Sequence, residues 1–307
     1  MSAEDWSAAA RVILERHGLR AGGLELFGTG SAVVLGTERL VVKIDVPRWA
    51  RNMASEVAWL EHVEGRSSVA APRPVATGEL EGWPYFVMTR VHGRPVAEVW
   101  PRLTHAARAH LARGLGAFRA ELFALEPPSW AKPWRLFARE ARRASRERRS
   151  LGAEQRPELA RLVEECESFL AECGIGDDGF VGKAAAHGTL HTELLGDHVL
   201  VDVDADRPSV AAVIDFADAR VGPADYETAA VVEFVLRGER GLLREHLVAS
   251  GEAASSFDAG RERRLLAAAL CHRFALLPRL VAAAPDPPRT IDELATTLFG
   301  LAPRADR

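Results

Sequence analysis

The segment HGTLHTELLGDHVLVD, residues 187–202, contains two histidines four positions apart, followed by apolar residues typical of a strand. Phosphoryl transfer to a hydroxyl needs a group that accepts the hydroxyl proton and a metal ligand close to the phosphates. In a catalytic loop of that kind, a histidine precedes a carboxylate by two positions, and the metal ligand follows the carboxylate by five, directly before a strand. The two histidines define two possible registers for such a loop.

The second histidine gives the register that meets both requirements. If the strand is Val199–Val201, the metal ligand falls on His198. The carboxylate is then Glu193, and the histidine before it is His191. The register that begins at His187 places threonine and leucine at the two functional positions. We therefore expect the second register to form the catalytic loop, and a plain polar loop with a buried histidine is the alternative.

Another carboxylate stands at the end of an apolar run. Residues 210–214 have the composition of a buried strand, and Asp215 follows them directly. Packing alone explains this aspartate poorly, because an unpaired buried charge is costly. A divalent cation held together with phosphate oxygens explains it well. From this position alone, an aspartate that caps the next turn is an equal alternative.

Together these segments resemble the catalytic region of the aminoglycoside phosphotransferase family, small-molecule kinases with a protein-kinase-like fold. The family pattern His-Gly-Asp-x-x-x-x-Asn, a hairpin and Ile-Asp corresponds here to HTELLGDH at 191–198 and VIDFADARVGPADYETA at 213–229. Asp218, Gly222 and Asp225 match the continuation of that pattern. The resemblance covers most of the chain and is weakest across the arginine-rich helices and at the C-terminus.

The resemblance implies a role for each residue of the loop, although two of them depart from the family pattern. Glu193 replaces the catalytic aspartate and is one methylene longer, but it can still accept a proton from a hydroxyl. His198 replaces an asparagine metal ligand and is a softer, bulkier ligand than Mg²⁺ prefers. Asp215 would bind Mg²⁺, and His191 would orient the loop through a hydrogen bond to the backbone near Asp215.

The resemblance also implies a phosphate clamp in the N-terminal part of the chain. Lys43, in RLVVKI, would be the strand lysine that grips the nucleotide phosphates. Glu56 would hold it, because it lies about 60° from Met53 at the margin of the apolar face of the following helix. Glu61 is the alternative partner, and a surface lysine on an edge strand is the alternative reading of Lys43.

Two further segments would complete the nucleotide site. FGTGSAVV places Gly28 and Gly30 where a turn would cover the phosphates, and an ordinary hairpin explains the glycines equally well. WPYFVMTRVHG would link two lobes, with backbone groups from Met88 to Val91 bonding the purine edge. A plain core strand explains the same apolar residues.

The elements that must position these residues change character near residue 91. Before it, β-branched runs are separated by glycines, and one helix is expected at residues 51–63. After it, helical periodicity dominates, apart from a hairpin at residues 198–216. The period change marks the expected boundary between lobes.

With the resemblance, these patterns predict an α+β, protein-kinase-like, two-lobed fold. Residues 1–90 would form a small nucleotide-binding lobe with an antiparallel sheet and a helix. Residues 91–307 would form a larger, mainly helical lobe for catalysis and acceptor binding, with a helical insert at about 131–180.

Composition excludes several other classes of function. The chain is 48% hydrophobic and 27% charged, which is ordinary for a globular protein, and its net charge of −4 gives no basic surplus for nucleic acid. No apolar run approaches the ~18 residues of a membrane span, so we expect a cytoplasmic protein without a membrane partner. The three cysteines lack metal-ligand spacing, and Cys166, on the apolar face of a helical segment, is expected to be a buried thiol.

The residues that would recognise the acceptor each have two interpretations. Asp225, Glu227 and Glu233 follow the metal aspartate and could face the acceptor, although solvent-exposed helix charges are the alternative. The arginine-dense segment at 135–149 could bind an anionic or polar acceptor. A solvated helix face paired with its own glutamates is the preferred reading.

These observations predict a phosphotransferase that moves the γ-phosphate of ATP or GTP, with Mg²⁺, to a hydroxyl of a small molecule. The resemblance favours an antibiotic acceptor, an aminoglycoside or another hydroxylated compound, and hence a role in resistance. A small-metabolite kinase is the alternative within the class. A pseudokinase that acts as a binding module is the alternative outside it, favoured by the residues at positions 193 and 198. The sequence leaves the choice between monomer and dimer open.

Overall fold

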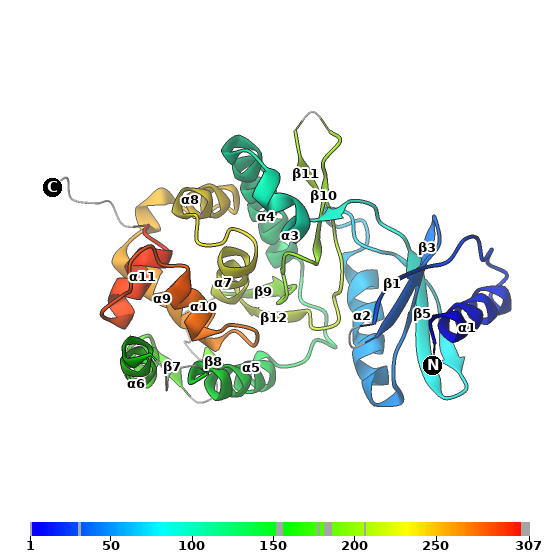
Figure 1. The fold of residues 1–307 in the computed structure, drawn as a ribbon, viewed down its shortest axis with the longest axis horizontal. Coiled ribbons are helices and arrows are strands. Elements are labelled where there is room, and N and C mark those ends of the chain that lie inside the picture. Colours follow the sequence, from blue (N-terminus) through cyan, green and yellow to red (C-terminus); the bar gives the residue numbers. More distant parts are fainter. Residues whose placement is uncertain are drawn as a thin grey trace.

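The computed structural model describes residues 2–29, 32–151, 156–176, 179–180, 186–205 and 207–301. The chain forms two lobes that lie side by side along the longest axis, the N-terminal one at the right of Figure 1. The described helices are α1 (Ala3–Arg16), α2 (Ala50–Val63), α3 (Val96–Val99), α4 (His105–Ala124), α5 (Trp134–Arg149), α6 (Pro157–Glu172), α7 (Ala224–Phe234), α8 (Arg240–Ala249), α9 (Ala259–Cys271), α10 (Leu277–Ala282) and α11 (Ile291–Leu298). The described strands are β1 (Glu25–Thr29), β2 (Val33–Gly36), β3 (Leu40–Ile44), β4 (Pro74–Leu80), β5 (Trp83–Thr89), β6 (Arg94–Pro95), β7 (Ile175–Gly176), β8 (Gly179–Phe180), β9 (His187–Leu190), β10 (Val199–Asp202), β11 (Ser209–Val213) and β12 (Arg220–Pro223).

The N-terminal lobe is an antiparallel sheet with the strand order β1-β2-β3-β5-β4. Lys43 on β3 pairs with Val34 on β2 and with Phe86 on β5. Side chains alternate between the two faces of a strand, so Lys43 shares one face with Val41. Lys43 therefore lies on a central strand of the sheet. The alternative, a surface lysine on an edge strand, is wrong.

A helix covers each face of this sheet. On the face of Lys43, Val41 and Phe86 join Met53 and Leu60 of α2 in one apolar cluster. On the other face, Val42 packs with Leu14 and its neighbours on α1. The sheet thus separates two apolar layers, and α2 is the layer that faces the second lobe in Figure 1.

The chain passes from one lobe to the other after β5. β5 ends at Thr89, and β6, at Arg94–Pro95, already pairs with β10 of the second lobe. The lobes also meet at a parallel bridge between Ala70 and Ala212, where the N–H of Val213 donates to the Ala70 carbonyl at 2.9 Å. This second connection places the strand that ends before Asp215 directly against the small lobe.

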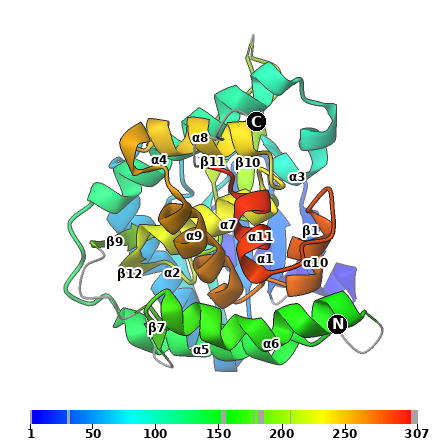
Figure 2. The same cartoon turned by 90° about the vertical axis from the view of Figure 1, so that its left-hand side faces the viewer.

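The C-terminal lobe is mainly helical. Its described strands form the small sheets β11-β10-β6, β12-β9 and β7-β8, and the first two carry the candidate catalytic region. α4 packs against α8, and α7 packs against α9. α5 and α6 lie side by side along one face of this lobe (Figure 2). Gly222 on β12 permits the approach of α5, because a Cβ there would lie 2.3 Å from the Trp134 ring.

Two expectations about the whole chain can be compared with this fold. Cys166 and Cys271 are buried free thiols, and Cys173 is a half-buried free thiol. Among the residues that the structure describes, no helix combines the length and the apolar character that crossing a membrane requires.

Candidate active site

Three charged side chains from three distant elements meet between the lobes. Nζ of Lys43 on β3 lies 2.7 Å from Oε2 of Glu56 on α2 and 3.3 Å from Oδ1 of Asp215, which follows β11. Glu56 is buried, and Lys43 is mostly so. Glu56, and not the exposed Glu61, is therefore the partner of the strand lysine.

These contacts control the charge of each member. Burial alone would lower the pKa of Lys43, but the carboxylates of Glu56 and Asp215 raise it above its ordinary value. Burial raises the pKa of Glu56 to about 7 against the opposing charge of Lys43. Burial also acts to raise the pKa of Asp215, but the positive charge of Lys43 is the largest opposing cause, and the pKa lies below its ordinary value. Lys43 therefore stays positively charged beside the negatively charged carboxylate of Asp215.

The candidate catalytic loop, residues 191–198, lies beside this group and is held by His191. Its Nε2 lies 2.9 Å from the Ile214 carbonyl, and its Nδ1 accepts a hydrogen bond from the N–H of Glu193 at 3.2 Å. A carbonyl only accepts and an N–H only donates, so the neutral ring carries its proton on Nε2. Burial lowers the pKa of His191 to about 3, which keeps the ring neutral. His191 therefore ties the loop to the residue before Asp215.

Thr192 adopts the left-handed conformation, with φ of 69°, which is uncommon for a residue with a Cβ. Three hydrogen bonds hold it there. Its N–H donates to Oε2 of Glu227 at 3.0 Å, and its hydroxyl donates to the Asp218 carbonyl at 2.9 Å. Its carbonyl accepts from Nε2 of His272 at 3.1 Å. The surrounding residues thus fix the backbone directly before Glu193.

Glu193 is buried at the centre of the site. Oε1 of Glu193 lies 3.1 Å from a guanidinium nitrogen of Arg273, which also binds the carboxylate of Asp218. Burial and the negative charge of Asp218 raise the pKa of Glu193 to about 8, and Arg273 opposes the shift. A carboxylate whose pKa lies near neutrality is well suited to accept a proton and release it again.

His198 is placed between the loop and Asp215. Its Nδ1 donates to the Glu193 carbonyl at 2.9 Å, and its Nε2 lies 3.6 Å from Oδ2 of Asp215. In the neutral ring, Nε2 therefore carries a lone pair directed towards the carboxylate. Asp215 also has a left-handed backbone, with φ of 66°, so both ends of the site use this rare conformation.

The donor set fits Mg²⁺ that enters with nucleotide phosphates. In the described part of the chain, no three His, Cys, Asp or Glu side chains form a group that could hold a metal. Mg²⁺ in phosphoryl-transfer sites is usually held by one or two protein ligands together with phosphate oxygens and water. Asp215 offers the hard oxygen ligand that this arrangement needs, with Nε2 of His198 beside it.

The expectation that Glu227 faces the acceptor is wrong. Glu227 is fully buried, and its carboxylate supports the loop through the N–H of Thr192. Asp225 binds the guanidinium of Arg261 and lines a different cavity, bounded by Arg119 and Arg264. Asp225 and Glu227 therefore both lie outside the lining of the cavity that adjoins Glu193.

The sequence predicts that the arginines of helix α5 form a solvated face. This prediction holds for only part of the helix. Arg143 is exposed and pairs with Glu147 at 3.0 Å, as expected. Arg142 and Arg149 are buried, however, and each lies 2.7 Å from Glu167 on α6. They join the two helices, so the expectation of an entirely solvated face is wrong.

The nucleotide-binding residues expected from the sequence are spread over the small lobe. Gly28 lies in β1 and pairs with Val34 at a bulge, whereas Gly30 lies outside the described residues. Met88 is buried in β5, opposite Val41, and Val91 lies in the connection between the lobes. Their contact with a purine remains a prediction.

A cavity of about 420 Å³ adjoins Glu193 through its two charged partners. Asp218 and Arg273 line it, together with Arg220 from β12 and residues of α5 and its approach. Lys132 and Glu140 are the other charged residues among its walls. Three cations and two carboxylates thus surround the space that opens beside the candidate base.

Sequence reasoning missed Arg273 and His272. Both follow α9 and reach the loop from about 80 residues away in the chain. Their neighbours in the sequence form no motif that relates them to positions 192 and 193. The charge of Asp218, which the sequence did single out, was the one available signal that a buried cation must lie nearby.

Comparison with known proteins places this geometry in a family. A sequence model of the phosphotransferase enzyme family (APH) matches residues 29–266. The chain therefore belongs to the phosphotransferase enzyme family, and the two-lobed, kinase-like fold expected from the sequence is confirmed. No curated protein matches the chain.

Solved aminoglycoside phosphotransferases share the fold at low identity. The GDP and kanamycin complex of APH(2")-IIIa is 18% identical, with a TM-score of 0.64 over 86% of this chain and 88% of that one. The ADP-bound APH(2'')-Ib is 15% identical, with a TM-score of 0.61 over 98% and 99%. An aminoglycoside-3'-phosphotransferase of type VIII is 22% identical, with a TM-score of 0.59 over 86% and 97%.

Proposed function

We propose that this protein transfers the γ-phosphate of ATP or GTP to a hydroxyl of a small molecule. The observation that carries the proposal is the meeting of Lys43, Glu56 and Asp215 beside Glu193. A buried lysine that is held between two carboxylates has a defined use when phosphates approach it. Nucleotides in the similar structures, named as GDP, ADP and ATP complexes, support a nucleotide donor.

Each residue of the site has a role in this reaction. Lys43, fixed by Glu56, binds phosphate oxygens, and Asp215 with His198 would hold Mg²⁺. When bound, Mg²⁺ neutralises the charge on the phosphates. Glu193 accepts the proton of the acceptor hydroxyl through Oε1 or Oε2. Its burial and the cation of Arg273 keep water out and its carboxylate oriented.

An antibiotic acceptor, and with it a role in resistance, is the first choice. Solved structures of similar fold are named as complexes with kanamycin, streptomycin and gentamicin. These acceptors share hydroxyl groups on a polar ring system, which is the chemistry that the proposed reaction needs.

A small metabolite without a large positive charge is the second candidate. It is favoured by the cavity beside Glu193, where Lys132, Arg220 and Arg273 face only two carboxylates. The one excess positive charge of this lining would repel a polycation, and it would attract an acceptor that carries a carboxylate or phosphate.

The test is mass spectrometry of pooled hydroxylated antibiotics and anionic metabolites, incubated with Mg²⁺ and either ATP or GTP. Asp215→Ala is the inactive variant, and Asp286→Ala, at an exposed site, is the matched control. We expect one acceptor to gain a phosphate with the wild type and the control but not with Asp215→Ala. If calorimetry detects no binding of either nucleotide to the wild type, the proposal is wrong.

A further inference from the structure

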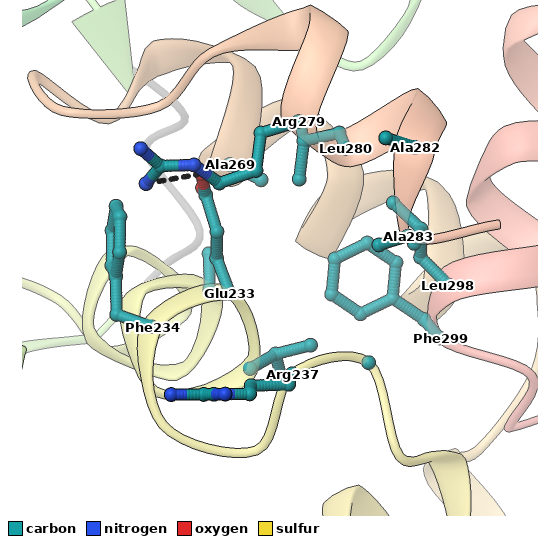
Figure 3. A pocket seen from close by; sticks show the side chains of 13 residues that line it. Glu233, Phe234, Arg237, Ala269, Arg279, Leu280, Ala282, Ala283, Leu298 and Phe299 are labelled. Carbon is teal, nitrogen blue, oxygen red and sulfur yellow. Dashed lines mark ion pairs between the residues drawn. The ribbon is translucent and has the colours of Figure 1, made fainter. Parts of the chain in front are cut away.

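A further cavity lies in the C-terminal lobe, among α7, α9, α10 and α11 (Figure 3). Its volume is about 440 Å³, within the range of small-molecule sites. Apolar side chains form most of its walls, among them Phe234 on α7, Leu280 on α10 and Phe299 beyond α11. The space thus suits an apolar body of modest size.

One carboxylate points into this apolar space. Figure 3 shows the side chain of Glu233 rising from α7 between Phe234 and Phe299. The side chain is 4% exposed, and neither carboxylate oxygen receives a hydrogen bond from any residue that the structure describes. Its one charged partner among the described residues that line the cavity is Arg279, whose half-exposed guanidinium forms a long ion pair with Oε1 at 4.0 Å, the dashed line in Figure 3. A buried acceptor of this kind is costly unless a ligand supplies the donor.

The protonation of Glu233 agrees with this geometry. Burial raises the pKa of Glu233 to about 8. The charge of Arg279 and the N–H of Leu276 oppose that shift, although neither completes a hydrogen bond to the carboxylate. At neutral pH the group therefore binds a proton, which an incoming cation would displace.

The other charged residues that line the cavity limit the charge of a ligand. They are Arg237, whose guanidinium reaches back to the Ala97 carbonyl, and Arg279, which is half exposed at the mouth. Because Arg237 is bonded to Ala97 and Arg279 is half exposed, the buried carboxylate can match one ammonium group, whereas each further positive charge of a polyamine would be repelled by the two cations. The apolar walls then contact the rest of the molecule.

We propose that this cavity binds a small monovalent amine with an apolar body, whose ammonium group is held by Glu233. The site adjoins the catalytic loop. Phe234 and Arg279 also line a groove with Gly196 and Asp197, and the Phe234 ring lies 5.3 Å from that of His272, which bonds Thr192. The proposal does not require phosphoryl transfer, because binding can be measured in the Asp215→Ala variant.

The experiment is calorimetric titration with 2-phenylethylamine at pH 7, with 2-phenylethanol and spermidine as comparison probes. We expect the amine alone to bind, with release of a proton that makes the heat depend on the buffer. Glu233→Gln should weaken binding by roughly ten- to a hundredfold, because a charge-assisted bond is lost. Asp286→Asn removes one exposed carboxylate of the same lobe and should leave binding unchanged.

Ala283→Phe narrows the mouth of the cavity without altering its charge, and it should also abolish binding. If Glu233→Gln melts at a lower temperature than the wild type, Ala283→Phe becomes the test of binding, because it leaves the carboxylate in place. Equal affinity for the alcohol and the amine, or undiminished binding by both variants, would overturn the proposal. Once an acceptor has been identified, the amine can be tested as an inhibitor of its phosphorylation. Competitive inhibition would assign the cavity to the acceptor, and an unchanged KM for the acceptor would assign the cavity to a separate ligand.

Discussion

One guanidinium nitrogen of Arg273 lies 3.1 Å from Oε1 of Glu193 and also binds the carboxylate of Asp218. Two carboxylates therefore share one cation inside the site. Burial and the negative charge of Asp218 raise the pKa of Glu193, and the positive charge of Arg273 opposes them. The protonation of the candidate base thus depends on a residue from the far end of the chain.

Replacing Arg273 by glutamine should shift the pH dependence of the reaction. Without the guanidinium the pKa of Glu193 rises above about 8, by roughly one unit or more, so less of the base is ionised at pH 7.5. The acidic limb of the kcat profile should therefore move to higher pH, and activity should recover partly at pH 9. Arg143→Gln, at an exposed arginine, is the control. A uniform loss at every pH would show that Arg273 does not act through the pKa of Glu193.

Glu193→Gln separates an enzyme from a pseudokinase. Glutamine keeps the size of the side chain but cannot accept a proton, so kcat should fall by roughly 10²–10⁴-fold. Nucleotide affinity, measured by calorimetry, should not change, because Lys43 and Asp215 are untouched. Glu193→Asp should keep measurable activity. Full activity in Glu193→Gln would mean that another group is the base.

The catalytic loop shows why part of this site was readable from the sequence. Histidine, carboxylate and strand follow one another at fixed spacing, because the hydrogen bonds that join His191 to Glu193 and Glu193 to His198 span only two and five residues within the loop. The sheet could also be read, since the alternation of Val41, Val42 and Lys43 reports the two faces directly. In both segments, residues that are close in the sequence are also close in the structure, so their spacing could be read directly.

The supports of that loop could not be read in the same way. Glu227, His272 and Arg273 come from α7 and from the end of α9, and only tertiary packing decides which loop they meet. Helical charge patterns favoured solvent for α5, because a single sequence does not show that α6 brings Glu167 to Arg142 and Arg149. Ion pairs between residues far apart in the sequence could therefore not be predicted from the sequence alone.

Lys43→Met should destabilise the fold in a pH-dependent manner. The variant leaves Glu56 buried without its cation, so its pKa rises further above the ordinary 4.5 than the present value of about 7. A carboxylate whose folded pKa is raised loses stability as pH increases from its unfolded pKa through its folded pKa. We expect a deficit of about 3 kcal/mol at pH 8 and clearly less at pH 6, from urea unfolding. Glu61→Gln on the same helix should show none, and an equal deficit at both pH values would contradict the pairing.

His246→Leu should flatten the acid side of the stability profile. His246 is fully buried on α8, its Nδ1 bonds the Ala112 carbonyl at 3.3 Å, and burial together with the charge of Arg119 lowers its pKa to about 3. In the unfolded chain a histidine takes up a proton below about pH 6.5, but the folded protein does not until about pH 3. The stability that neutral His246 contributes is therefore complete above pH 6.5 and is lost as pH falls towards 3. Urea unfolding between pH 6 and 4 should give a slope smaller by about 1.4 kcal/mol per pH unit in the variant. The exposed His92→Leu should leave the slope unchanged, and parallel profiles for His246→Leu and the wild type would mean that His246 is protonated in the folded state.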